Sequence, residues 1–314
     1  GQLLVSERSL FNGNFTETAA ATATDLATDQ YVSWYDERSP GLRAWILVTN
    51  QGSAAAEVDI DTGGTPLGHF HIPAGGIVTP EFPGVLGGPV RVRSTNGQPL
   101  TVSARTTYGN SFNETHGLPG TQLSTEYLFS WYDARSPGMR SWVIVNNLSA
   151  QDTTVHIFIG SWFAGSYSVP AGGTVTPEFP GSMDGPVKVV STDGQPLAAS
   201  MRTVYLNSLE EVDGAAPAAL TSRQWFSWYD SASPGMRSWV MVGNMNSSSA
   251  VVKIKLRGAT LGQYTIPPGG RITPMLTGLI DGPLEITEVN GKALLVSQRV
   301  LYNNSFNELW GSKI

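Results

Sequence analysis

Apolar and polar residues alternate over short stretches throughout the chain. Residues 57–61 read Glu-Val-Asp-Ile-Asp, and residues 251–255, at the same place in a later copy, read Val-Val-Lys-Ile-Lys. The second and fourth positions stay aliphatic, while the positions between them change even the sign of their charge. A period of two places alternate side chains on opposite faces of a β-strand. The pattern therefore predicts half-buried strands, with one face in a core and the other in water.

Other segments and turn signals complete one unit of this kind. We predict a strand over residues 31–36, a turn at Arg38-Ser39-Pro40-Gly41, and a central strand over residues 44–48 that is apolar on both faces. The last hairpin is predicted to join residues 90–94 to residues 100–107 through a type I′ turn at Asn96-Gly97. About seven strands in a unit of this size, with frequent turns, are the proportions of an immunoglobulin-like β-sandwich.

The same unit occurs three times without an insertion or a deletion. The segment Ser-Trp-Tyr-Asp begins at residues 33, 130 and 227, in steps of 97 residues, and Thr-Pro pairs at 79, 176 and 273 keep the same offset. Loops usually drift in length, so the gapless alignment indicates a recent duplication or a regular lattice. A repeat of this length is a domain with its own core, and we expect beads on a string. The predicted all-β chain has three β-sandwich repeats, at residues 24–117, 118–214 and 215–314.

Residues 1–23 carry an additional copy of the strand that closes each repeat. Residues 4–8 read Leu-Val-Ser-Glu-Arg, close to Leu-Val-Ser-Gln-Arg at 295–299, and we expect the Asn-Gly hairpin to tie such a strand to the repeat before it. The explanation we favour is that the chain is cut from a longer array. Alternatively, residues 3–15 are a donated strand that completes a neighbouring subunit by β-augmentation, with Leu4, Val5, Arg8 and Leu10 as the exchanged residues. Against strand donation, the third repeat already has its own closing strand.

Composition narrows the class of protein. The net charge is −6, only 14% of residues are charged, and there is no cysteine. A negative chain lacks the clustered Lys and Arg that nucleic-acid binding requires, and no apolar run reaches the ~18 residues of a membrane helix. Without cysteine, disulfides and thiolate metal sites are excluded. We expect a secreted protein, with candidate glycan acceptors at Asn14, Asn113, Asn147, Asn246 and Asn303.

No set of catalytic side chains recurs with the repeat. The four histidines, at positions 69, 71, 116 and 156, have no histidine 97 residues away. Serine-histidine chemistry requires a positioned histidine and an acid. His69 and His71 lie two apart on one strand face, but a metal site would need a third ligand, which the sequence does not point to. We therefore predict a protein that is not an enzyme and that uses no cofactor or metal.

The aromatic and charged residues that do recur are candidates for binding. They are Trp34, Tyr35, Asp36 and Arg43 in the first repeat, Trp131, Tyr132, Asp133 and Arg140 in the second, and Trp228, Tyr229, Asp230 and Arg237 in the third. Aromatic faces stack on sugar rings, and Asp and Arg bind hydroxyls, so one interpretation is a carbohydrate platform. The interpretation we favour is structural: the tryptophans lie in the core or between sheets, and Asp36 pairs with Arg43 or Arg105.

Three segments resemble repeats found in secreted bacterial proteins. They are Phe226-Ser227-Trp228-Tyr229-Asp230, Ser233-Pro234-Gly235-Met236 and Ser305-Phe306-Asn307-Glu308. The resemblance covers nearly the whole chain. It implies immunoglobulin-like modules of the kind that trail cell-wall hydrolase or other extracellular domains, with no catalytic residues to carry over.

Two functions follow as expectations. The first is a secreted structural repeat protein, a surface-layer, stalk or filament subunit that associates with itself or through neighbouring repeats. The alternative is a tandem array that binds cell-wall or other polysaccharide, in which weak sites gain avidity through linkage. Accessible rings at Trp34, Trp131 and Trp228 would favour the second.

Overall fold

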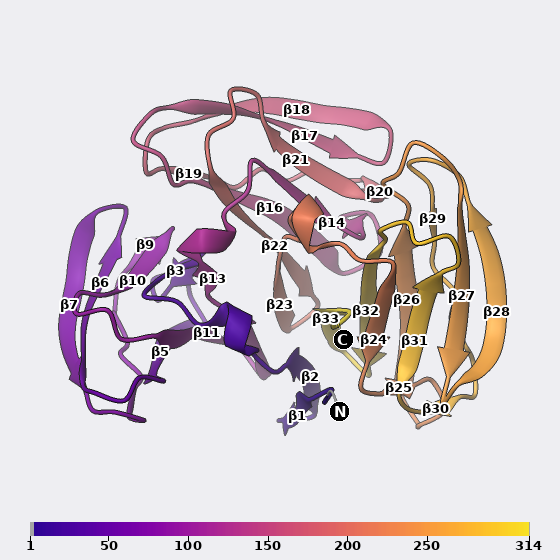
Figure 1. Ribbon diagram of the computed structural model, residues 1–314, viewed down its shortest axis with the longest axis horizontal. Helices are drawn as coiled ribbons and strands as arrows, with labels where there is room; N and C mark the ends of the chain where they lie inside the picture. Colours follow the sequence, from indigo (N-terminus) through magenta and orange to yellow (C-terminus); the bar gives the residue numbers. More distant parts are fainter. Residues whose placement is uncertain (1–2, 314) are drawn as a thin grey trace.

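The computed structural model describes residues 3–313, and their regular structure is almost entirely β, as predicted (Figure 1). Gly1, Gln2 and Ile314, at the outer ends of the predicted ranges 1–23 and 215–314, lie outside the described residues. Within the described part, helical geometry is limited to three short 3-10 turns, η1 (Ala23–Asp25), η2 (Gly120–Gln122) and η3 (Pro217–Ala219). No helix between residues 3 and 313 is long and apolar enough to cross a membrane.

The chain begins with a two-stranded hairpin, formed by β1 (Ser6–Phe11) and β2 (Asn14–Ala19). Its turn, Asn12-Gly13, has a positive φ at both residues (49° and 79°). Asparagine and glycine tolerate this left-handed geometry, which is what a tight two-residue reversal between antiparallel strands requires.

The first repeat contains two sheets and a short ribbon. One sheet has the strand order β13-β3-β10-β6-β7, the other has the order β12-β11-β5-β8, and the ribbon joins β4 to β9. The strands are β3 (Asp29–Val32), β4 (Tyr35–Asp36), β5 (Leu42–Asn50), β6 (Ala56–Thr62), β7 (Thr65–Ile72), β8 (Ile77–Val78), β9 (Leu86–Gly87), β10 (Val90–Ser94), β11 (Leu100–Tyr108), β12 (Ser111–His116) and β13 (Leu118–Pro119).

The core lies between these two sheets. The alternation of β6 places Val58 and Ile60 in the core, while Glu57 and Asp59 lie on the outer face, as the sequence pattern predicts. On β5, Ile46 is buried in the same core. Burying an aliphatic side chain of this size contributes about 1.5–3 kcal/mol, so the core is a main source of stability.

The second and third repeats have the same sheet orders. They are β14-β21-β17-β18 with β19-β16-β22-β23, and β24-β31-β27-β28 with β29-β26-β32-β33, and the ribbons are β15-β20 and β25-β30. The strands of the second repeat are β14 (Glu126–Phe129), β15 (Tyr132–Asp133), β16 (Met139–Asn147), β17 (Thr153–Ile159), β18 (Trp162–Val169), β19 (Thr174–Val175), β20 (Met183–Asp184), β21 (Val187–Ser191), β22 (Leu197–Tyr205) and β23 (Ser208–Asp213). Those of the third are β24 (Arg223–Phe226), β25 (Tyr229–Asp230), β26 (Met236–Gly243), β27 (Ala250–Leu256), β28 (Ala259–Ile266), β29 (Arg271–Ile272), β30 (Ile280–Asp281), β31 (Leu284–Glu288), β32 (Leu295–Tyr302) and β33 (Ser305–Trp310). Each has its own cluster of buried apolar side chains.

The predicted hairpin at Asn96-Gly97 is wrong. Strands β10 and β11, on either side of the turn, belong to different sheets and do not pair. Gly97 has a positive φ (80°) but Asn96 does not, so the turn is not type I′. Asn96 instead donates through Nδ2 to Ala55 O at 2.8 Å, which ties the turn to the neighbouring loop. The turn therefore carries the chain from one sheet to the other.

Pairing also crosses the predicted boundary between the first two repeats. Leu118 and Pro119, assigned from the sequence to the second repeat, form β13 and pair with β3 of the first. In the later repeats, single bridges from Ala215 to Leu128 and from Ser312 to Trp225 hold the equivalent place.

The repeats surround a common centre and are not strung out like beads. In Figure 1 the sheets of the first, second and third repeats lie at the left, top and right of a fan, and β2, β23 and β33 lie near its middle. The middle consists of four hairpins, which we name A (β1–β2), B (β11–β12), C (β22–β23) and D (β32–β33). Hairpins B, C and D each extend from one sheet of their own repeat, and hairpin A is a separate two-stranded sheet.

Candidate functional site

The second strands of the four hairpins contact one another in a closed ring. Strand β2 contacts β12 and β33, and β23 also contacts both β12 and β33. At three joins, a serine hydroxyl at the start of one strand accepts a hydrogen bond of 3.0–3.1 Å from a backbone N–H of the next; the pairs are Ser305 with Phe15, Ser111 with Leu209, and Ser208 with Phe306. At the fourth join, Asn14 Nδ2 donates to Asn110 O at 2.8 Å. The ring joins segments almost 300 residues apart.

The same polar network recurs in every hairpin. A serine hydroxyl donates to one oxygen of a glutamate at 2.7 Å, and an arginine guanidinium donates to the other oxygen at 2.6–3.0 Å. The sets are Ser6, Glu17 and Arg8 in A, Ser103, Glu114 and Arg105 in B, Ser200, Glu211 and Arg202 in C, and Ser297, Glu308 and Arg299 in D. A carboxylate bound on both oxygens keeps its charge when buried, so the network can lie inside the protein.

At the centre of the ring lies a carboxyl group without an arginine. Glu210 of β23 accepts hydrogen bonds from the side-chain amides of Asn113 at 2.9 Å and Asn307 at 3.0 Å, and from the backbone N–H of Glu308 at 3.1 Å. Burial raises the pKa of Glu210 to about 8, although these three donors act in the opposite direction. Burial therefore favours the protonated form of Glu210 more than it does for a glutamate in water.

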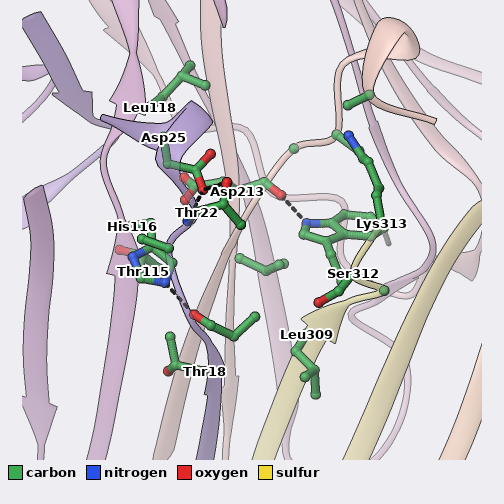
Figure 2. A pocket seen from close by; sticks show the side chains of 18 of the residues that line it. Thr18, Thr22, Asp25, Thr115, His116, Leu118, Asp213, Leu309, Ser312 and Lys313 are labelled. Atoms are coloured by element: carbon green, nitrogen blue, oxygen red, sulfur yellow. Dashed lines mark hydrogen bonds between the residues drawn. The ribbon is translucent and has the colours of Figure 1, made fainter. Parts of the chain in front are cut away.

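A cavity of about 440 Å³ opens beside this ring. Figure 2 shows His116, Thr22 and Asp25 on one side of it and Lys313 and Leu309 on another. Burial, with the nearby charge of Glu211, raises the pKa of Asp213, and partial burial lowers the pKa of Lys313. A cavity of this volume is within the range of small-molecule sites.

One position of the repeat, which lines the cavity, holds a different residue in each of the four copies. The four equivalent positions at the end of the second strands hold Ala19, His116, Asp213 and Trp310. His116 Nε2 donates to Ala19 O at 2.7 Å, and Trp310 Nε1 donates to Asp213 O at 2.6 Å. His116 Nδ1 is buried with no partner among the described residues. The sequence analysis missed this position because it searched for residues that recur, whereas here divergence is the signal.

The tyrosines that recur in the three repeats have a structural role. In each repeat the tyrosine of Ser-Trp-Tyr-Asp is fully buried, its hydroxyl donates to one backbone carbonyl, and it accepts from a backbone N–H across the core, all at 2.6–2.8 Å. The residues are Tyr35, Tyr132 and Tyr229. Burial raises the pKa of each hydroxyl.

The predicted pairing of Asp36 with Arg43 or Arg105 is wrong. Asp36 accepts hydrogen bonds from the backbone N–H groups of Arg38 and Ser39, at 3.1 and 2.8 Å, and so stabilises the turn that follows it. Arg105 pairs with Glu114 inside hairpin B. Asp133 and Asp230 bond the equivalent turns.

The arginines that follow lie on a different surface. Arg43 and Arg140 are exposed, pair with the half-buried Glu81 and Glu178, and stack over Trp45 and Trp142. Arg237 stacks over Trp239, at 5.8 Å from the ring centroid. The structure thus does not bring the predicted Trp, Asp and Arg together as one sugar site.

Two of the tryptophans of Ser-Trp-Tyr-Asp, Trp131 and Trp228, contact an arginine from another part of the chain. Arg271 of the third repeat lies 4.9 Å from the ring centroid of Trp131 and donates to Gly185 O of the second repeat at 3.0 Å. Arg8 of hairpin A lies 5.8 Å from the ring of Trp228. Trp34, Trp131 and Trp228 are all half-buried.

The serines before these tryptophans bond to another part of the chain. Ser130 of the second repeat contacts Ser297 of hairpin D at 2.6 Å, and Ser227 of the third repeat contacts Ser6 of hairpin A. In the first repeat, Ser33 O accepts from Asn146 Nδ2 of the second at 3.0 Å. The Ser-Trp segment is therefore a contact between successive repeats.

Two of the five candidate glycan acceptors are inaccessible. Asn113 bonds Glu210 at the buried centre of the ring, and Asn147 is buried with its amide bonded to three backbone carbonyls. Neither can carry a glycan in the folded protein, so these two predictions are wrong. Asn14 and Asn246 are half-buried and hydrogen-bonded, and Asn303 is exposed.

The residues considered for strand exchange remain within hairpin A. Arg8 pairs with Glu17 at 2.8 Å, Leu4 is half-buried, and Val5 and Leu10 are exposed. His69 and His71, considered for a metal, are exposed on β7 and bond Asp59 and Glu57 of β6. Among the described residues no group of three or more His, Cys, Asp or Glu is arranged to hold a metal ion.

The outer face of the second repeat carries an aromatic cluster that the sequence analysis missed. Phe163 lies 5.3 Å from both Phe158 and His156, measured between ring centroids, and Lys188 Nζ lies 4.9 Å from the ring of Phe158. Phe163 is half-exposed. Its neighbour Trp162 is also half-exposed but lies on the other face of β18, with its ring centroid 6.0 Å from that of Phe179. The signal was in the repeat alignment, because the other two repeats have at these positions Asp59, Asp61, Thr65 and Pro66, and Lys253, Lys255, Ala259 and Thr260.

Comparison with known proteins found no family model that matches the chain and no curated protein with significant sequence similarity.

Proposed function

We propose that the protein is a non-catalytic, extracellular structural repeat protein, a building block of a surface layer or a related assembly. Its modules would be three immunoglobulin-like β-sandwiches, one for each 97-residue repeat. The observation that carries the proposal is the hairpin ring, in which the same Ser-Glu-Arg network occurs four times. Side chains that recur in every copy are committed to holding modules together.

The arrangement favours a compact block over a stalk. A stalk gains length when its modules are joined end to end, whereas these three repeats share a centre (Figure 1). Polar networks that are fully hydrogen-bonded fix one arrangement of the surrounding parts. The low fraction of charged residues and the resemblance to secreted repeats support an extracellular location.

Mass photometry and negative-stain electron microscopy of the purified protein test this proposal. We expect three-lobed particles that associate into sheets or filaments as the concentration rises. Particles that stay monomeric at every concentration would contradict a role as the subunit of an assembly.

A second candidate function, carbohydrate binding, is favoured by the aromatic cluster on the second repeat. Exposed apolar side chains cost solubility unless they contact a ligand, and aromatic faces stack on sugar rings. The ring of Phe163, in the cluster with Phe158 and His156, is 48% exposed, whereas Trp34, Trp131 and Trp228 are half-buried. The sugar surface that we propose therefore belongs to the second repeat.

Binding to an array of cell-wall and other polysaccharides tests the second candidate. The variant Trp162→Thr/Phe163→Pro installs the residues of the first repeat, Thr65 and Pro66, and should abolish binding while circular dichroism stays unchanged. Trp131→Phe is the matched control and should retain binding. Loss of binding in the control alone would return the sugar site to the Ser-Trp-Tyr-Asp segment.

A further inference from the structure

Strand β1 of hairpin A differs from its counterparts in hairpins B, C and D, each of which also pairs with a strand of a sandwich. Strands β11, β22 and β32 pair with their own hairpin on one side and with β5, β16 or β26 on the other. Among residues 3–313, strand β1 pairs only with β2, so its other edge is open there. Open edges present unpaired N–H and C=O groups that can accept a further strand.

The residues just before β1 have the apolar pattern of a strand that packs against a core. Leu3 is 88% exposed and Val5 is 55% exposed. The six residues at the equivalent positions are all fully buried in sandwich cores, and they are Leu100, Val102, Leu197, Ala199, Leu294 and Val296. Of these eight equivalent apolar side chains, only those of Leu3 and Val5 are exposed to water.

The Arg-Glu pair of hairpin B is the most exposed of the four, which is an independent observation. The Arg-Glu pair of hairpin D is covered by Ser130 and its neighbours, and the arginine side chain of that pair, Arg299, is 8% exposed. In hairpin C the arginine is 10% exposed. Arg105 of hairpin B is 42% exposed. Its Glu114 is bonded by Ser103 and Arg105 of the same hairpin.

The open edge of β1 and the exposed Arg-Glu pair of hairpin B border the same sector of the ring. Hairpin A lies next to hairpin D on one side and to hairpin B on the other. Each repeat closes on its own hairpin and places its Ser-Trp segment against the repeat or hairpin that follows around the ring. By the same rule, a sandwich closed by β1 would place its Ser-Trp segment on Arg105 and Glu114.

We propose that this sector binds a fourth β-sandwich body of the same repeat type, joined to the chain ahead of β1, which takes β1 as its closing strand. The body would bury Leu3 and Val5 in its core, pair its central strand with the open edge of β1, and cover Arg105. The ring of four hairpins would then carry four bodies. This inference rests on burial and pairing alone, and it holds for either proposed function.

The test is an extended protein in which a second copy of residues 215–291 precedes Gly1. Gly1 corresponds in the repeat to Lys292, so the register into β1 is kept, and the donor repeat closes on Leu294 and Val296, which match Leu3 and Val5. Hydrogen exchange of the amides from Ser6 to Phe11 is measured with and without the extension. We expect these amides to exchange roughly tenfold more slowly or better in the extended protein.

A matched control is the extended protein with Leu3→Glu and Val5→Glu, which puts charges where the new core would lie. The slow exchange should be lost in this variant. If the added copy is digested by protease and leaves β1 exchanging as in the unextended protein, the proposal is overturned. Protection that appears only in dimers seen by mass photometry would also overturn it, because the body would then act between chains.

The opposite side of the sector provides a second readout. Arg105→Ala should lower the melting temperature more in the extended protein than in the unextended one, because the added body would leave Glu114 buried without its partner. Equal shifts in the two proteins would show that nothing covers hairpin B, and would contradict the proposal.

Discussion

At the scale of single residues, the arginine–glutamate pairs of this protein differ in how deeply they are buried. Arg202 and Glu211 lie almost completely buried in hairpin C, at 2.7 Å, whereas Arg43 and Glu81 form an equally short pair in water. A buried charge that loses its partner keeps its desolvation cost, whereas an exposed charge regains water. Arg202 and Arg299 belong to the buried kind, whereas Arg8 and Arg105, at the same repeat position, are 30% and 42% exposed.

The variant Arg202→Ala should lower the free energy of unfolding by about 3–5 kcal/mol, because it leaves Glu211 buried and unpaired. The matched control Arg43→Ala should change it little, because this exposed pair is screened by water. Urea denaturation measures both. Similar values for the two variants would contradict the structural role of the hairpin pair.

The carboxyl at the centre of the ring makes stability depend on pH. The pKa of Glu210 is raised from its ordinary value of 4.5 to about 8 by burial, so between these values the folded protein keeps a proton that the unfolded chain releases. Stability from this group is fully present below pH 4.5 and is lost as the pH rises through 8.

The variant Glu210→Gln removes this group while keeping its shape. We expect the variant to be more stable than the original protein at pH 8–9 and to differ little at pH 5, in melting temperatures measured across that range. A difference that grows toward acid pH would mean that Glu210 is ionised in the folded protein.

At the scale of elements, the sequence predicted strands better than their partners. The alternation around Val58 and Ile60 gave the buried face of β6 correctly, because burial and period are local properties. The turn at Asn96-Gly97 was read as a hairpin because a local turn signal does not say which sheet the next strand joins. A sandwich requires some turns to cross between sheets, and β10 and β11 flank such a turn.

A pair of equivalent leucines tests the contrast between β1 and its counterparts. Leu100→Ala should cost about 2–5 kcal/mol of stability, because Leu100 is fully buried in the first core. Leu3→Ala, at the same repeat position but exposed, should change stability by less than about 0.5 kcal/mol. A large cost for Leu3→Ala, measured by the same urea denaturation, would show that hairpin A is already covered.

At the scale of the whole molecule, three repeats and an additional closing strand could be recognised from the 97-residue offset. The ring could not, because it depends on contacts between residues that are far apart in the chain and that no local pattern connects. Ser130 and Ser297 touch across 167 residues, and Ser6 and Ser227 across 221. The sequence marked these serines only as parts of two separate motifs. The cavity position occupied by Ala19, His116, Asp213 and Trp310 was missed for the opposite reason, since it differs in every copy.

The closure of the ring by hairpin A is the central claim, and the absence of cysteine allows a direct measurement of it. The side-chain oxygens of Ser6 and Ser227 are in contact, so the variant Ser6→Cys/Ser227→Cys places two thiols within disulfide reach. The control Ser6→Cys/Ser130→Cys pairs residue 6 with a serine that contacts hairpin D instead. After mild oxidation and peptide mapping by mass spectrometry, we predict a disulfide between residues 6 and 227 within one chain, and none in the control. A disulfide that links two chains, or no disulfide at all, would contradict the closed ring.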